Sequence, residues 1–156
     1  MSALAAKFAN TTEDHLQFVA NHMRDEDVAE VWATGFYTPH QALVESVKHS
    51  DYLFTVLHDG IPLAIVGLQV RGILTGTGIP WLLSSDEALK HKRLFMTLAP
   101  VVLQDMLRVC SSLENFVHVE NSLSIHWLKR LGFDFGERVV NPVTDEPFYR
   151  FSMRVL

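Results

Sequence analysis

The segment Asn121–Phe133 constrains the fold more than any other part of the chain, because it carries signals for both ends of one short helix. It reads N-S-L-S-I-H-W-L-K-R-L-G-F. Asn121 or Ser122 can cap the helix by accepting hydrogen bonds from N–H groups of the first turn. Gly132 stands where a left-handed C-terminal cap is favoured, and Phe133 opens a new apolar run. The segment therefore predicts a helix that leads directly into a strand.

The same segment also resembles a family motif. Its pattern, N-x-x-[A/S]-I-x-x-L-x-[K/R]-L-G-F, is similar to the C-terminal acyl-CoA-contacting motif of GNAT-type N-acetyltransferases. The positions that match in register are Asn121, Ser124, Ile125, Gly132 and Phe133. An ordinary amphipathic helix that stops at a glycine would show many of these features, because its apolar residues recur at three- and four-residue spacing. The order of the other elements has to decide between the two interpretations.

That order agrees with the order of the GNAT fold. Strands are predicted over Ala3–Ala9, Tyr52–His58, Ile61–Arg71, Ile79–Ser84, Phe116–Glu120, Phe133–Val140 and Phe148–Val155. Helices are predicted over Glu13–Met23, from about Asp25 to Gly35, from Pro39 to about His49, and over Leu94–Leu113, where Pro100 marks a kink or a helix start. The predicted class is α/β (α+β), a GNAT-like mixed central sheet of six to seven strands flanked by helices, in a single domain over residues 1–156.

Composition restricts the function classes. The chain has 156 residues, of which 48% are hydrophobic, and its net charge of -5 does not favour nucleic-acid binding. The single cysteine, Cys110, lies in an apolar run and is expected to be buried. The histidines show no metal-ligand spacing, so no metal site is predicted. With no signal peptide and no bilayer-length apolar run recognised, we expect a soluble cytoplasmic protein that does not associate with membranes.

The resemblance implies where acetyl-CoA and its acceptor would bind. The fourth and fifth strands, Ile79–Ser84 and Phe116–Glu120, should splay apart so that pantetheine lies between them. Backbone N–H groups at Leu82, Leu83 and Ser84 would polarise the thioester carbonyl, and Asn121 would also contact the cofactor. The acceptor would be the amine of a small molecule or of a protein.

The expected pyrophosphate site departs from the family pattern. The pattern [Q/R]-x-x-G-x-[G/A] is absent, because Ser85 to Phe95 contains no glycine. The basic residues that could replace the glycine loop are Lys90, His91, Lys92 and Arg93. The same run can equally be a solvated basic helix face, and Asp86 and Glu87 nearby would repel a phosphate.

Candidates for proton transfer are less sharply defined. His118 and Glu120 are expected to alternate onto one face of the fifth strand, where either could act as the base. Asp86 and Glu87 follow the fourth strand and are alternatives, and each of these residues could instead have a structural role. Leu128 occupies the position of the family's acid tyrosine, so general acid catalysis from that position is excluded.

A second resemblance keeps a non-catalytic alternative open. Four runs are similar to segments of small tailed-phage proteins, which include the GNAT-like internal virion protein A type of T7-like phages: W-L-L-S-S-D-E-A-L, F-V-H-V-E-N, S-I-H-W-L-K-R-L-G-F and P-F-Y-R-F. The alternative function is therefore a phage virion, morphogenesis or host-interaction protein on the same scaffold. It would place the protein in the virion or the host cytoplasm, with virion or host proteins as partners. A homodimer is compatible with either hypothesis.

Overall fold

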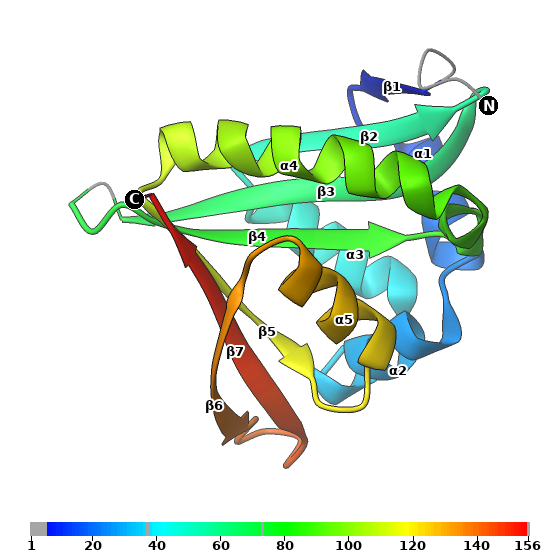
Figure 1. Ribbon diagram of the computed structural model, residues 1–156. Coiled ribbons are helices and arrows are strands. Elements are labelled where there is room, and N and C mark those ends of the chain that lie inside the picture. Colours follow the sequence, from blue (N-terminus) through cyan, green and yellow to red (C-terminus); the bar gives the residue numbers. More distant parts are fainter. Residues whose placement is uncertain (1–5, 37, 73, 156) are drawn as a thin grey trace.

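The computed structural model describes residues 6–36, 38–72 and 74–155, which form a twisted sheet between two layers of helices (Figure 1). The seven strands are ordered β1-β2-β3-β4-β5-β7-β6. They span β1 (Ala6–Ala9), β2 (Tyr52–His58), β3 (Ile61–Gly72), β4 (Thr77–Ser84), β5 (Ser112–His118), β6 (Asp134–Val140) and β7 (Pro147–Arg154). The pairing of β4 with β5 is parallel and the other pairings are antiparallel.

The helices divide between the two faces of this sheet. They are α1 (Glu13–Asn21), α2 (Asp25–Ala33), α3 (Pro39–Lys48), the short 3₁₀ helix η2 (Asp86–His91), α4 (Lys92–Val109) and α5 (Ser122–Arg130). Helices α4 and α5 cover one face, whereas α1, α2 and α3 lie behind the sheet in Figure 1. Each layer has its own apolar core: Phe95 and Leu113 belong to the first, and Val19, Leu43 and Ile65 belong to the second.

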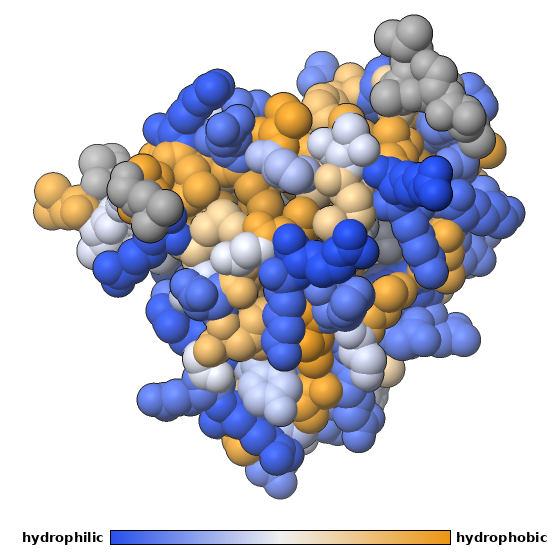
Figure 2. Space-filling model, in the orientation of Figure 1, coloured by the Kyte–Doolittle hydropathy of each residue, from blue (hydrophilic) through white to orange (hydrophobic). Residues whose placement is uncertain are grey.

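The outer surface of the α4 and α5 layer is a mosaic of hydrophilic and apolar residues (Figure 2). Val101 and Val109 of α4 are about half exposed, as is Phe116 of β5. Within the part of the chain that the structure describes, no helix combines the length and hydropathy needed to cross a bilayer.

Several local predictions are confirmed by the backbone. The β2–β3 hairpin turns at Asp59 and Gly60, whose φ angles are 50° and 79°, as expected for an Asp-Gly turn. Gly132 has a φ of 100° at the end of α5. Just after this glycine, the N–H of Phe133 donates a hydrogen bond to the carbonyl of Leu128 at 3.1 Å. A glycine cap therefore ends this helix, as predicted. Cys110 is buried, with 1% of its surface exposed.

Other boundaries differ from the predictions. The long helix ends at Val109 rather than Leu113, and β5 covers Ser112–His118 rather than Phe116–Glu120. The apolar spacing continues past the helix end, but Leu113 is completely buried in the sheet core, so tertiary packing overrides the helical period. Pro100 lies inside α4 and does not start it. The first strand is described from Ala6, and its predicted residues 3–5 lie outside the described residues.

Two helix ends are also corrected. The first helix ends at Asn21, two residues before the predicted Met23, which instead forms a bridge with Ser85. Asn121 occupies the N-cap position of α5, but its side chain makes no capping hydrogen bond there. The amide of Asn121 is instead directed to other groups, described below.

We expect Gly67→Ala to lower the free energy of unfolding by about 1–3 kcal/mol, the usual cost of overpacking a core. A methyl group at Gly67 would overlap the indole ring of Trp81 on the neighbouring strand. Urea denaturation followed by circular dichroism would measure the change. Gly136→Ala in β6 is the matched control, because its added methyl group would meet its nearest neighbour at 3.7 Å, an ordinary contact. Equal stability changes in the two variants would contradict the packing argument.

Candidate functional site

Strands β4 and β5 part soon after they meet, which confirms the predicted splay. Their pairing is limited to Thr77 with Ser112 and Gly78 with Leu113. One step further along, Asn115 Nδ2 donates to the carbonyl of Pro80 at 2.7 Å, so a side chain spans the gap that a backbone pair would otherwise close. The wedge-shaped region beyond this contact is called the splay here, and it is the candidate site.

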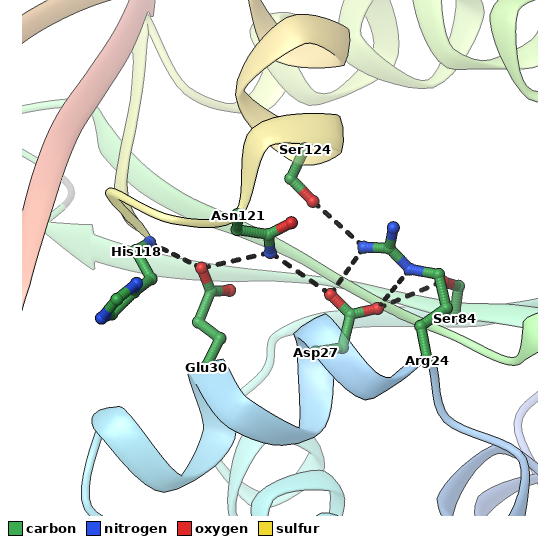
Figure 3. A network of polar contacts seen from close by, with 7 residues as sticks. All are labelled: Arg24, Asp27, Glu30, Ser84, His118, Asn121 and Ser124. Atoms are coloured by element: carbon green, nitrogen blue, oxygen red, sulfur yellow. Dashed lines mark hydrogen bonds and ion pairs between the residues drawn. The ribbon is translucent and has the colours of Figure 1, made fainter.

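The segment between α1 and α2 lies against the far end of β4. Met23 forms an antiparallel bridge with Ser85, and the N–H of Asp86 donates to the carbonyl of His22 at 2.6 Å. This segment therefore occupies the edge position beside β4 that β5 has left. It also brings the start of α2 to the open end of the splay (Figure 3).

A buried ion pair occupies this open end. Arg24 Nε and Nη2 donate to the two carboxylate oxygens of Asp27 at 2.8 and 2.7 Å, and both side chains are 8% exposed. Burial alone would lower the pKa of Arg24, but the hydrogen bond and charge of Asp27 outweigh that effect and raise it, so Arg24 stays charged. Arg24 also donates to Ser124 Oγ at 3.1 Å, and Ser84 Oγ donates to Asp27 at 3.4 Å. The pair thus connects α2 to β4 and α5.

Glu30, one turn further along α2, continues this network. Its Oε1 accepts from the N–H of His118 at 2.6 Å and from Asn121 Nδ2 at 3.4 Å. Burial raises the pKa of Glu30 above its usual value, and the charge of Asp27 raises it further, although the two hydrogen bonds lower it. Both of these hydrogen bonds use Oε1, so Oε2 takes none from the residues that the structure describes, and Glu30 as a whole is partly buried. Glu30 is therefore a carboxylate anchored through one oxygen with the other oxygen available for chemistry.

Asn121 links the two acidic side chains and keeps one unsatisfied atom. Its Nδ2 faces Asp27 and Glu30, which is the orientation that two carboxylates require. Its Oδ1 is buried without a partner among the described residues, and the residue as a whole is 3% exposed. A buried acceptor without a donor is costly, so Oδ1 is suited to receive an N–H group from a ligand.

The three backbone N–H groups predicted to donate to the thioester carbonyl all lie on β4, but they do not all point to the same side of the strand. Register places Val66, Ile65 and Ala64 opposite Leu82, Leu83 and Ser84, respectively. The N–H of Ser85 donates to Leu63 on β3 at 2.9 Å, and N–H groups of an antiparallel pair alternate between the two edges. The N–H of Leu83 therefore faces β3, whereas those of Leu82 and Ser84 face the splay.

The predicted bases lie beside the splay but have other partners. His118 Nε2 is 3.0 Å from Glu146, and His118 Nδ1 accepts from the N–H of Glu120 at 3.1 Å. The ring thus points away from the Glu30 carboxylate, as Figure 3 shows. Glu120 is exposed in the turn after β5 and not on the strand. Their catalytic roles remain predictions, and the structure adds Glu30 to the candidate bases.

The basic run lies where β4 leads into α4. Lys90 pairs with Glu87 at 3.0 Å, and the ring of His91 lies 4.2 Å from that of His58. Lys92 and Arg93 are exposed in the first turn of α4, and no side chain caps that helix. A helix N-terminus with two nearby cations is a favourable place for an anion.

Together these groups fit acetyl-CoA in part. The free N–H groups of β4 and the unsatisfied Asn121 Oδ1 suit the amide-containing pantetheine arm. The start of α4 suits a pyrophosphate, although the glycine loop of the family pattern is missing. Within residues 6–36, 38–72 and 74–155, no group of three His, Cys, Asp or Glu side chains is arranged to hold a metal ion.

Sequence reasoning missed the residues that α2 supplies. Arg24, Asp27 and Glu30 follow one another at three-residue spacing, which places them on one face of a helix. The spacing was visible in the sequence, but no local pattern indicates that this polar face is buried.

Comparison with solved structures agrees with this architecture. The Ard1 protein of Thermoplasma volcanium has a TM-score of 0.73 at 15% identity, over 97% of this chain and 99% of that chain. Spermidine N-acetyltransferase of Vibrio cholerae, solved with CoA and spermine, has a TM-score of 0.73 at 16% identity, over 97% of this chain and 96% of that chain. A GNAT-family acetyltransferase of Bacillus anthracis has a TM-score of 0.72 at 11% identity, over 96% and 95%. The chain has the GNAT fold.

Comparison of sequences adds nothing to this result. No protein-family model matches the chain, and the search of curated proteins found no match. At the identities given above, the structural likeness establishes the fold, and the function has to be argued from the site.

We expect Asp27→Asn to lower the free energy of unfolding by about 3–5 kcal/mol, because Arg24 would remain buried without its counter-ion. Chemical denaturation at neutral pH measures the change. Asp25→Asn is the matched control, since Asp25 is exposed in the first turn of the same helix, and it should cost less than about 1 kcal/mol. Equal losses in the two variants would show that the buried pair is not specifically important.

Proposed function

We propose that the protein is an N-acyltransferase that moves an acetyl group from acetyl-CoA to an amine. The observation that carries this proposal is the splay itself, where unpaired N–H groups on β4 and the Glu30 carboxylate border the same opening. The Vibrio cholerae neighbour, solved with CoA and spermine, supports the reaction class. The acceptor is proposed to be a small-molecule amine.

Acetyl-CoA would supply an acetyl thioester, whose reaction with an amine gives an amide and a free thiol. The N–H groups of Leu82 and Ser84 would polarise the thioester carbonyl, as in other oxyanion holes. Asn121 Oδ1 would accept an amide N–H of the pantetheine arm, and Lys92 and Arg93 would hold the pyrophosphate at the start of α4. Leu128 provides no proton, so the thiol would leave as a thiolate.

The reaction needs one further function, removal of a proton from the amine, because a protonated amine cannot attack. Glu30 is placed for this through Oε2, and its raised pKa brings the carboxylate closer to the working range of a general base. His118 remains an alternative base, although both of its ring nitrogens already have partners. The cytoplasmic location and the homodimer remain predictions of the sequence.

The phage interpretation is the second hypothesis from the sequence. None of the similar structures named above is a virion protein, and no contact in the described residues favours it over catalysis. It therefore stays a prediction from the resemblance of four short segments.

We expect acetyl-CoA to bind the purified protein with a measurable heat in isothermal titration calorimetry. The double variant Lys92→Ala/Arg93→Ala should weaken this binding about tenfold or more, because charge-assisted hydrogen bonds to phosphate are among the stronger polar contacts. Arg108→Ala, at the opposite end of α4, is the matched control and should bind as the wild type does. No heat and no thermal shift at millimolar acetyl-CoA would overturn the proposed function.

We expect Glu30→Gln to lower kcat by about 10²–10⁴-fold without loss of stability at neutral pH. Burial raises the pKa of Glu30 in the folded state, so its stabilising contribution is complete below the unfolded pKa and is lost as pH rises through the folded pKa. The amide oxygen of glutamine can still accept from the N–H of His118. Measurements are kcat against pH and the Tm of both proteins.

The control for this variant is Glu26→Gln, an exposed acidic residue on the same helix. The wild type should lose activity as pH falls through the raised pKa of Glu30, and the Glu26 variant should follow the same profile. A Glu30→Gln protein with wild-type kcat and an unchanged pH profile would exclude Glu30 as the base and favour His118 in that role.

A further inference from the structure

A pocket opens at the narrow end of the splay, on the face of the sheet that carries α3. Its volume is about 290 Å³, near the lower end for small-molecule sites. The lining residues that matter here are Phe36, Glu45, His49, Gln69, Trp81 and Asn115. Asn115 is the residue that spans β4 and β5, so the pocket lies where the two strands begin to part.

The aromatic wall of this pocket is held rigidly. Trp81 Nε1 donates to Ser50 Oγ at 2.7 Å, and Ser50 Oγ in turn donates to the carbonyl of Ser46 at 2.7 Å. The indole ring lies so close to Gly67 that no side chain could be accommodated there. Phe36, which follows α2, supplies a second ring. Fixed aromatic faces are suited to contact with an organic cation.

The charge of the pocket points to the same ligand. Glu45 is its only acidic residue, and its lining contains no lysine or arginine among the described residues. The side chain of Glu45 is 41% exposed and lies 3.6 Å from His49, the one other titratable group among the described residues of the lining. With histidine counted as neutral, as in the formal net charge of the chain, the described lining carries one negative charge, on Glu45. The amides of Gln69 and Asn115 add neutral polar contacts.

The pocket borders the part of β4 whose N–H groups are proposed to polarise the thioester carbonyl. Trp81 lines the pocket, and the next residue of β4, Leu82, supplies the first of the N–H groups that face the splay. On β5, Asn115 lines the pocket and His118, three residues on, donates its N–H to Glu30. A ligand in the pocket therefore lies beside the proposed carbonyl donors.

We propose that this pocket binds the acceptor as a small aliphatic amine that carries a second cationic group. One ammonium group lies between Glu45 and the faces of Phe36 and Trp81, and the other amino group extends toward the splay, where it is acetylated. This inference rests on the proposed function for the identity of the reaction, but the binding itself does not require acetyl-CoA. The volume restricts the acceptor to a chain of a few carbon atoms.

The test compares 1,4-diaminobutane with butylamine, which has the same chain and one charge fewer. Titration followed by the fluorescence of the tryptophans and by calorimetry, without acetyl-CoA, gives both dissociation constants. We expect the diamine to bind more tightly than butylamine at pH 8. Glu45→Gln should weaken diamine binding about fivefold, as expected for a partly exposed ion pair. It should weaken butylamine binding as well, because the single ammonium group of butylamine would occupy the same place beside Glu45.

Glu26→Gln is the control variant and should bind the diamine as the wild type does. Glu45→Lys should abolish diamine binding while the circular dichroism spectrum stays the same, because Glu45 lies at the surface. Equal affinity for the two amines, or unchanged diamine binding in both Glu45 variants, overturns the inference. Diamine binding in a protein that does not bind acetyl-CoA would instead contradict the proposed function and leave this pocket assignment in place.

Discussion

The buried pair of Arg24 and Asp27 is the interaction on which the splay depends. Where β4 and β5 separate, the sheet loses the backbone hydrogen bonds that would otherwise connect them. The ion pair and its contacts with Ser84 and Ser124 supply polar connections between α2, β4 and α5 at the open end. A buried pair of this kind adds little net stability over apolar packing, but losing one partner is costly. It therefore fixes the geometry of the opening more than it stabilises the fold.

This arrangement leaves polar groups available to a ligand at a break in the sheet. A continuous sheet leaves its backbone groups satisfied by neighbouring strands, so it offers no donors to a ligand. The parting of β4 and β5 leaves N–H groups of β4 directed into the opening. Beside it, the side-chain oxygen of Asn121 is buried without a donor among the described residues. The same parting creates the aromatic pocket at the narrow end. Backbone donors from β4 and the Glu30 carboxylate from α2 thus meet at the same break in the sheet.

The site could be predicted only where its residues belong to one segment. The family resemblance of its segment indicated Asn121 as a site residue, and the structure places Asn121 in the buried polar network. Glu30 and the ion pair come from α2, about ninety residues earlier in the sequence, and meet Asn121 only after folding. The sequence likewise could not predict which N–H groups of β4 face the splay, because a shift of one residue in the register with β3 would reverse their directions.

The sequence alone determined the local elements and their order. The Asp-Gly hairpin, the glycine that ends α5 and the apolar strand β3 follow from backbone preferences and short-range periodicity, which act between neighbouring residues. The tertiary structure decided where the long helix stops, since the burial of Leu113 in the sheet outweighs the helical spacing around it. It also decided which polar residues became a site. Burial and charge pairing depend on segments distant in the chain, so the approach of α2 to the splay gave Glu30 its raised pKa and Asp27 its partner.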